Sequence, residues 1–181
     1  NTISTADHAM AMLLSLSRNI PQATASVKAG AWERSKYTGV ELDSKVLGII
    51  GVAGRVGQQV VRRARAFGMT VLGADPFLSD DLARQLQIES ASYDEIFAES
   101  DYITLHTVLT DQTHHLISSQ ALAQCKDGVR IINCARGELI DEEALVEAID
   151  SGKVAGAALD VFNEEPPSAD HPLVKRPEVI C

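Results

Sequence analysis

The sequence predicts an α/β fold in which helices cover both faces of a doubly wound parallel sheet. From residue 45 onward, short apolar runs of strand length alternate with stretches of helical spacing. The apolar runs are continuous rather than alternating, as in strands that are buried on both faces. The first run leads into a glycine-rich turn that opens a helix. At 181 residues, the chain has the length of one well-buried domain.

The first 44 residues predict a helical segment that precedes the sheet. Ser4, with Asp7 three residues later, has the spacing of a capping box ahead of an apolar helix. This helix should stop before Pro21, because the residue ahead of a proline avoids helical angles. A second helix is expected over 21–28, and the irregular segment after it contains the only tryptophan, Trp32.

Residues 45–181 predict a single domain of alternating strands and helices. Strands are expected at 46–50, 69–75, 101–107, 129–135 and 154–161, and the tail at 177–181 is compatible with one more. Helices are expected at 55–68, 79–87, 92–100, 118–125 and 141–152. Such alternation produces parallel strands joined by right-handed crossovers.

Composition narrows the classes of partner. The formal net charge is −9 and the pI is near 4.9, which argues against nucleic acid or an anionic membrane as the main partner. No apolar run reaches the length of a membrane span. Three cysteines without a CxxC pair indicate reduced thiols and a cytoplasmic location. No Cys/His cluster or HExxH motif is present in the sequence, so no metal is expected.

The glycine-rich turn reads "GVAGRVG" from Gly51 to Gly57. Its first gap is one residue longer than in the dinucleotide-binding pattern G-x-G-x-x-G. Gly54 and Gly57 have the spacing of the last two glycines of that pattern, so we interpret Gly51 as the last residue of the strand. A phosphate loop of the G-x-x-x-x-G-K-[ST] type is excluded. A turn that no longer binds a cofactor remains the alternative.

An acidic residue follows the second strand. Asp75 stands 18 residues after Gly57, where a carboxylate can accept both hydroxyls of an adenosine ribose and repel a 2′-phosphate. The glycine-rich turn and Asp75 together therefore favour NAD over NADP. Asp75 could instead cap a turn ahead of Pro76, and an acidic residue here also suits methyltransferases that bind S-adenosylmethionine.

Polar residues follow the later strands as well. Arg136 comes directly after a buried strand and could hold a carboxylate in a bidentate manner, or pair with Glu138 or Asp141. Asp160 ends the next strand and could orient a catalytic base, or belong to a solvated acidic loop. For His106, a ring satisfied within the fold is the preferred interpretation.

Several motifs together resemble one family. "NTISTADH", "GRVG", "GADPF", "LHT", "INCARGELID" and "AGAALDVFNEEPP" are similar to the D-isomer-specific 2-hydroxyacid dehydrogenases over almost the whole chain. The resemblance implies that residues 45–181 form an NAD-binding domain with the Rossmann fold. It also implies a separate substrate-binding domain that this chain lacks, and a dimerisation region in residues 1–44, hence a homodimer.

The resemblance also assigns site residues. The pyrophosphate turn would contain Gly54, Arg55, Val56 and Gly57, the adenosine would contact Asp75 and Thr107, and the nicotinamide would lie among Cys134, Ala135 and Asp160. Arg136 would bind the carboxylate and carbonyl oxygen of the substrate. Glu165 would hold a catalytic histidine expected beyond Cys181.

Within the family, the likeness is to the branch that oxidises 3-phosphoglycerate in serine biosynthesis. The implied reaction is hydride transfer from the substrate to NAD. The 181-residue chain alone is expected to bind NAD without turnover. Glyoxylate or hydroxypyruvate reductases, formate dehydrogenases and NAD-sensing transcriptional corepressors of the same fold remain alternatives.

Overall fold

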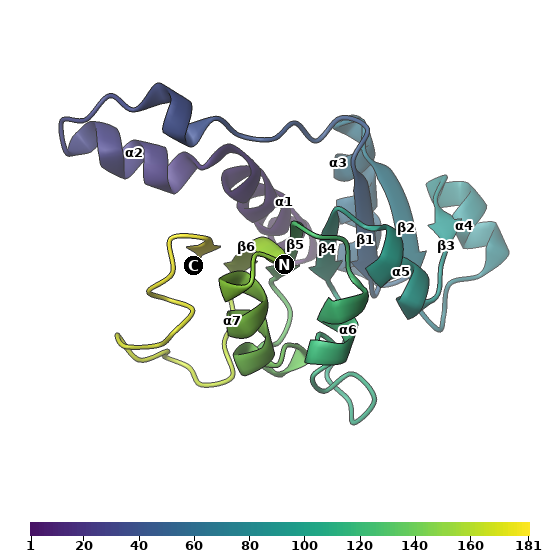
Figure 1. The fold of residues 1–181 in the computed structure, drawn as a ribbon. Helices are drawn as coiled ribbons and strands as arrows, with labels where there is room; N and C mark the ends of the chain where they lie inside the picture. Colours follow the sequence, from purple (N-terminus) through teal and green to yellow (C-terminus); the bar gives the residue numbers. More distant parts are fainter.

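Parallel strands form one seven-stranded sheet in the computed structural model, which describes residues 1–181 (Figure 1). The strand order is β3-β2-β1-β4-β5-β6-β7, and every neighbouring pair is parallel. The direction of winding reverses between β1 and β4, which confirms the doubly wound prediction. The strands are β1 Val46–Ile50, β2 Thr70–Ala74, β3 Glu89–Ser90, β4 Tyr102–Leu105, β5 Val129–Asn133, β6 Val154–Leu159 and β7 Val179–Ile180.

Helices cover both faces of this sheet. The helices are α1 Thr2–Arg18, α2 Ile20–Lys28, α3 Arg55–Ala66, α4 Asp80–Leu86, α5 Tyr93–Glu99, α6 Ser119–Gln124 and α7 Glu142–Asp150. One cluster of buried apolar side chains joins α1 and α3 to one face, and a second joins α5, α6 and α7 to the other. The strands between the two clusters are buried on both sides, which explains their continuous apolar sequences.

Alternate residues of β4 show how the strands divide between the two clusters. Tyr102 belongs to the cluster under α1, while Ile103 and Leu105 belong to the cluster under α5 and α6. The hydroxyls of Tyr102 and Ser17 lie 3.0 Å apart, so α1 has a buried polar contact with the sheet as well as apolar packing.

The start of α1 differs from the sequence prediction. The helix begins at Thr2 with Asn1 as the capping residue, so the prediction that Ser4 is the cap was wrong. The Ser4 hydroxyl donates to the carbonyl of Asn1 from inside the helix. Asp7 does not complete a capping box, because its carboxylate pairs with Arg63 of α3 at 2.6 Å. A tertiary ion pair thus takes the place of the predicted hydrogen bond to the backbone of the capping residue.

Shorter elements also differ from the prediction. The second helix starts at Ile20 rather than Pro21, and proline occupies its first turn, where a missing N–H costs nothing. No sequence pattern indicated β3 or the 3₁₀ turns Arg34–Tyr37 and Gly137–Leu139. Two to four residues are too few for a periodic pattern.

Two glycines of the turn pack directly against neighbouring backbone. Strand β1 ends at Ile50, so the prediction that Gly51 is the last strand residue was wrong. The N–H of Gly51 nevertheless donates to the carbonyl of Ala74 in β2. Gly51 has φ +90°, and a Cβ there would lie 2.5 Å from the peptide between His106 and Thr107. A Cβ on Gly57 would lie 2.4 Å from the carbonyl oxygen of Gly51. Each position therefore needs glycine.

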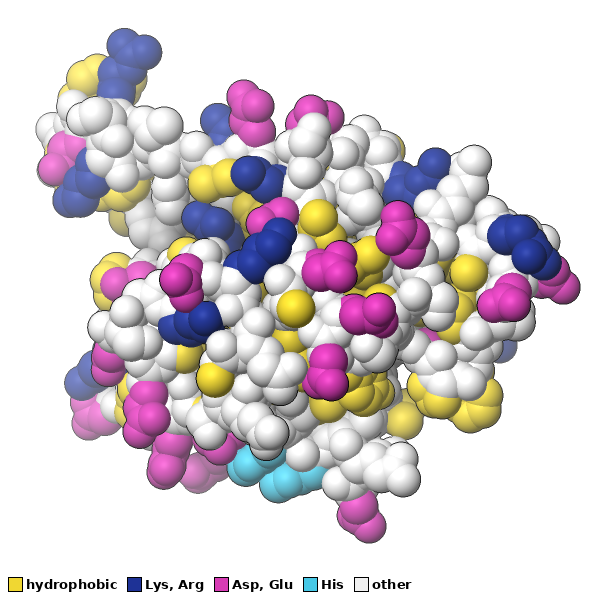
Figure 2. All heavy atoms as spheres, turned by 45° about the vertical axis from the view of Figure 1, so that its right-hand side comes forward, with side chains coloured by type: hydrophobic (Ala, Val, Ile, Leu, Met, Phe, Trp, Pro, Cys, Tyr) yellow, Lys and Arg dark blue, Asp and Glu magenta, His cyan; other side chains and the backbone are white.

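An arm formed by α2 and the segment after it projects from the body (Figure 1). α2 has no buried residue, and Trp32 beyond it is 75% exposed. On the face seen in Figure 2, Lys and Arg side chains are scattered among acidic ones and form no continuous stripe. None of the helices is both long and apolar enough to cross a membrane.

Substituting Gly57 with alanine should destabilise the domain. The new methyl group would meet the Gly51 carbonyl and the Val52 backbone, which cannot move aside as a side chain could. We expect the free energy of unfolding in urea to fall by about 1–3 kcal/mol. Gly54→Ala is the matched control, because its Cβ would approach only the Gly51 oxygen, at 3.3 Å. An equal loss in both variants would contradict the packing role of Gly57.

Candidate functional site

A continuous groove follows the carboxyl edge of the sheet. It joins two hollows of about 970 Å³ and about 620 Å³, which share His106, Thr107 and Val108 as lining residues. We call the smaller hollow the Asp75 half and the larger one the Asp160 half, after a residue that lines each. The groove crosses the point between β1 and β4 where the winding reverses, which is where open α/β sheets bind ligands.

In the Asp75 half, the carboxylate of Asp75 is held against the glycine turn. One oxygen accepts the backbone N–H of Ala53 at 3.0 Å, and the other accepts that of Phe77 at 2.9 Å. Tyr93 lines the same hollow, and burial together with the charge of Asp75 raises the pKa of its phenol. The Asp75 carboxylate is therefore fixed in direction at the edge of the groove.

Helix α3 begins in the glycine turn without a side-chain cap. Gly54 is its N-cap, and its first turn contains no acidic residue. The other crossover helices α4, α5, α6 and α7 are each capped by a side chain, from Ser79, Ser92, Ser118 and Asp141 respectively. The first N–H groups of a helix have no partner within it, so those of α3 can donate to an anionic ligand.

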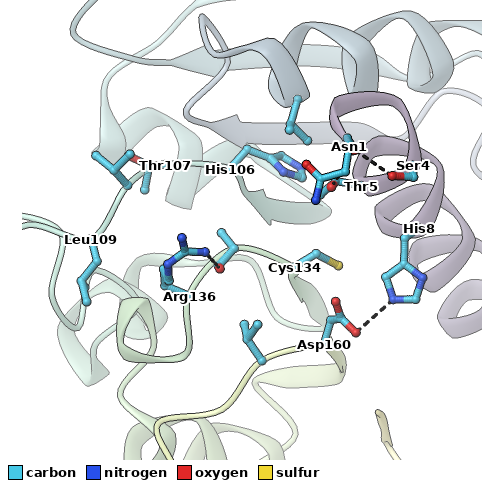
Figure 3. Close-up of a pocket in the computed structure, with 14 residues that line it drawn as sticks. Asn1, Ser4, Thr5, His8, His106, Thr107, Leu109, Cys134, Arg136 and Asp160 are labelled. Carbon is cyan, nitrogen blue, oxygen red and sulfur yellow. Dashed lines mark hydrogen bonds and ion pairs between the residues drawn. The ribbon is translucent and has the colours of Figure 1, made fainter. Parts of the chain in front are cut away.

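In the Asp160 half, three side chains stand in a row that faces α1 (Figure 3). They are His106, Cys134 and Asp160, each lining the groove just beyond the end of β4, β5 or β6. Successive side chains of a strand alternate between faces, and each of the three follows by two positions a residue buried on the α1 side. Strand alternation thus aligns them.

His106 is a neutral residue in the floor of the groove. Burial lowers the pKa of its imidazole to about 4. Its Nε2 atom forms a hydrogen bond of 2.9 Å with the hydroxyl of Thr104, two residues back along β4. The ring is therefore satisfied within the fold, as the sequence favoured, while also lining both halves of the groove.

Asp160 is paired with the first helix. Its carboxylate lies 3.1 Å from Nε2 of His8, and both side chains are about half exposed. Cys134 lies beside this pair (Figure 3). Burial, and after it the charge of Asp160, raises the pKa of the Cys134 thiol to about 12. This thiol is therefore a weak nucleophile at neutral pH.

Arg136 is exposed at the rim of the groove and has no carboxylate partner. Its guanidinium donates only to the carbonyl of Ala135, at 2.6 Å, so the alternative pairing with Glu138 or Asp141 is absent. Asn133 shapes the turn that presents it, by donating to the Arg136 carbonyl and accepting the Ala135 N–H. Arg136 is thus free to bind an anionic group.

Glu165 lines a smaller hollow that adjoins the Asp160 half at Arg136. Its carboxylate accepts the backbone N–H of Phe162 at 3.2 Å. Gly137 brings the two segments together, because a Cβ there would lie 2.1 Å from the Phe162 carbonyl group. The structure thus brings Arg136 and Glu165 to the walls of one hollow.

Most residues predicted for the site lie along the groove. Arg55 and Gly57 do not: Arg55 is exposed at the start of α3, and Gly57 is buried beneath the turn. The predicted residues that line it are Gly54, Val56, Asp75, Thr107, Cys134, Ala135, Arg136 and Asp160.

The sequence prediction missed the contribution of α1. Ser4, Thr5 and His8 from its first turns form a wall of the Asp160 half. Nothing local to these residues signals this, because their partners follow strands β4 to β6 in the sequence. The position of His106 was recoverable, since strand alternation puts it on the same face as Thr104.

The fold and the groove define a dinucleotide-binding domain, and comparison with known proteins gives its family. The family described as "D-isomer specific 2-hydroxyacid dehydrogenase, NAD binding domain" matches residues 10–181. The chain belongs to this family, and it is an NAD-binding domain.

Individual relatives narrow the family further. The D-3-phosphoglycerate dehydrogenase of Bacillus subtilis is 53% identical over 181 residues, which is all of this chain and 34% of the relative. The enzyme of the same name from Homo sapiens is 47% identical over 99% of this chain and 33% of its own length. The chain therefore spans about a third of the curated relatives it matches.

Solved structures agree on the fold. The D-lactate dehydrogenase of Aquifex aeolicus, complexed with NAD and lactic acid, aligns with a TM-score of 0.89 and 35% identity, over 99% of this chain and 58% of that one. A formate dehydrogenase from Granulicella aligns with a TM-score of 0.94 and 30% identity, over 99% and 48% respectively.

The buried His106 should make stability depend on pH. Its pKa is about 4 in the folded chain, against 6.5 for a free imidazole, so the unfolded chain takes up a proton first as the pH falls. The stabilisation is complete above pH 6.5. We expect it to decrease by about 3 kcal/mol in total as the pH falls through 4.

The test is urea unfolding at several pH values between 7 and 4. His106→Gln should flatten the dependence, whatever it does to stability at pH 7. His114→Gln is the control, because His114 is exposed. If the wild type and His106→Gln have parallel pH profiles, His106 is not the group responsible.

Proposed function

We propose that this chain is the NAD-binding part of an enzyme that oxidises 3-phosphoglycerate to 3-phosphohydroxypyruvate, the first step of the phosphorylated serine pathway. The observation that carries the proposal is identity near 50% to several D-3-phosphoglycerate dehydrogenases along the whole chain. The solved structures with other substrates in their names are 30–38% identical. Three free cysteines support a cytoplasmic location.

The groove suits NAD along its length. The uncapped N-terminus of α3 would bind the pyrophosphate through backbone N–H groups, with Gly54 permitting close approach. Asp75 would accept hydrogen bonds from the adenosine ribose, beside Thr107. Cys134, Ala135 and Asp160 would surround the nicotinamide in the Asp160 half.

Arg136 and Glu165 would act on the substrate. The bound nicotinamide supplies the hydride acceptor. Arg136 would hold the substrate carboxylate and polarise the oxygen at the reacting carbon, since its guanidinium has no competing carboxylate. Glu165 would hold the imidazole of a histidine outside this chain. The neutral imidazole would accept the hydroxyl proton as the hydride leaves, and the carboxylate of Glu165 would stabilise the imidazolium that results.

The alternatives differ in what completes the site. A reductase of glyoxylate or hydroxypyruvate, or a formate dehydrogenase, would use the same groove with a different substrate-binding domain. An NAD-sensing corepressor would keep the groove and bind peptides in place of a small acid. Comparing peptide capture with oxidation of 3-phosphoglycerate by the longer polypeptide separates these classes.

The α2 arm would pair with a second copy of the chain. Ile20, Val27 and Trp32 are 49%, 53% and 75% exposed, a concentration of apolar surface typical of an interface. We expect a concentration-dependent dimer in analytical ultracentrifugation. Trp32→Ser should weaken it by about tenfold or more. Phe67→Ser, at an exposed position outside the arm, should not, and a strict monomer would refute the proposal.

NAD binding to the 181-residue chain, followed by calorimetry, tests the cofactor assignment. Asp75→Ala should weaken NAD binding by about 10- to 100-fold, because a charged acceptor is lost. Asp80→Ala, which removes an exposed carboxylate nearby, should have no effect. Given 3-phosphoglycerate, the same chain should form no NADH.

Binding of NADP distinguishes a ribose contact from a loosened turn, since Asp75 also holds the Ala53 N–H. Loss of a ribose-binding carboxylate weakens NAD and relieves repulsion of the 2′-phosphate, so the preference for NAD over NADP should shrink. If both cofactors weaken equally, Asp75 acts only on the turn. If NAD binds equally to both forms of the chain, the assignment is wrong.

A further inference from the structure

Three side chains of different chemistry converge in the Asp160 half of the groove. Nε2 of His8, Sγ of Cys134 and a carboxylate oxygen of Asp160 all lie within 4.8 Å of one another. They come from α1 and from the ends of β5 and β6, so no sequence motif links them. The sequence contained no Cys/His cluster, and the expectation that no metal is held rested on that absence.

The spacing fits a tetrahedral cation. Ligands bonded at 2.0–2.3 Å around a tetrahedral centre are separated by roughly 3.3–3.7 Å. The His8 and Asp160 atoms are already 3.1 Å apart, and the Cys134 sulfur lies within 4.8 Å of both. One imidazole, one thiolate and one carboxylate form a donor set typical of Zn²⁺, and unsuited to Mg²⁺ or Ca²⁺.

The three groups are accessible to an ion. Two of the three groups are half exposed on the wall of the groove, so an ion can enter from solvent. Burial and the charge of Asp160 keep the Cys134 thiol protonated, and a bound cation would offset both effects. On binding, the Cys134 S–H bond breaks, sulfur keeps the electron pair to form the bond to the metal, and the proton leaves to solvent.

We propose that His8, Cys134 and Asp160 form a Zn²⁺-binding site, with a fourth position open to the groove for water. Arg136 and His106 do not coordinate the ion. Arg136 is cationic, and His106 is engaged with Thr104. The site has no side chain that could act as a second thiolate, so the affinity should be that of a reversible, regulatory ion.

Occupation of this site should exclude NAD. This consequence rests on the proposed function, in which Cys134 and Asp160 contact the nicotinamide. The ion would hold both residues and keep α1 tied to β6 through His8. Zn²⁺ would then act as an inhibitor that competes with the cofactor rather than with the substrate.

Cobalt substitution tests the site directly on the 181-residue chain. Co²⁺ alone should produce a thiolate-to-metal charge-transfer band and the visible bands of four-coordinate cobalt, and Zn²⁺ should displace it. Cys134→Ser should abolish the charge-transfer band. Cys181→Ser is the matched control, because Cys181 is the only exposed cysteine, and it should leave the spectrum unchanged. No band in the wild type, or a band that survives Cys134→Ser, would overturn the proposal.

A second variant guards against a folding defect at the buried cysteine. His8→Gln changes an exposed side chain and keeps the thiol, so the band should persist while Co²⁺ affinity falls by about tenfold or more. Unchanged affinity would remove His8 from the site.

Competition is measured separately. NAD affinity in the absence of metal tests the proposed function, and its dependence on Zn²⁺ tests exclusion. If NAD binds equally well in the presence of saturating Zn²⁺, the ion does not occupy the nicotinamide position.

Discussion

The contact between Gly51 and the peptide of His106 and Thr107 is the constraint on which the groove depends. It joins the loops after β1 and β4, the two strands between which the winding reverses. Because Gly51 has no side chain, the glycine turn packs directly on the loop after β4 at the centre of the sheet edge. The start of α3 therefore faces the groove. Gly57 then seats α3 on the same turn. A side chain at either position would move the start of α3 away from the groove.

Backbone contacts of the same kind recur near Arg136 and Glu165. Gly137 allows the segment that presents Arg136 to touch the loop that carries Glu165. The local charge of the groove differs from the net charge of the chain. The chain has a net charge of −9, yet the groove offers an uncapped helix start at one end and an unpaired guanidinium at the other. Local dipoles and one arginine therefore create anion sites that the overall charge would not suggest.

The sequence predicted well whatever depends on local pattern. The strands, the crossover helices and the residues just beyond strand ends follow from periodicity, and Asp75, Arg136 and Asp160 were found in this way. Prediction failed where residues distant in the sequence determine the partner of a side chain. Asp7 pairs with Arg63 instead of capping α1, and His8 reaches Asp160 from the other end of the chain. Gly51 was placed in the strand because its left-handed φ, +90°, leaves no trace in the order of residues.

The packing of α1 has a consequence for synthesis. This helix is synthesised before the sheet on which it packs, and its buried side chains belong to a cluster that includes Ala158 of β6 and Ile180 of β7, far later in the sequence. At 5–20 residues per second, its apolar face waits for roughly 10–30 s for those partners. During that interval Met10, Leu13 and Leu16 are exposed, so the nascent chain presents an aggregation-prone apolar helix before the sheet is complete. Efficient production of this domain thus depends on what shields α1 until the last strand emerges.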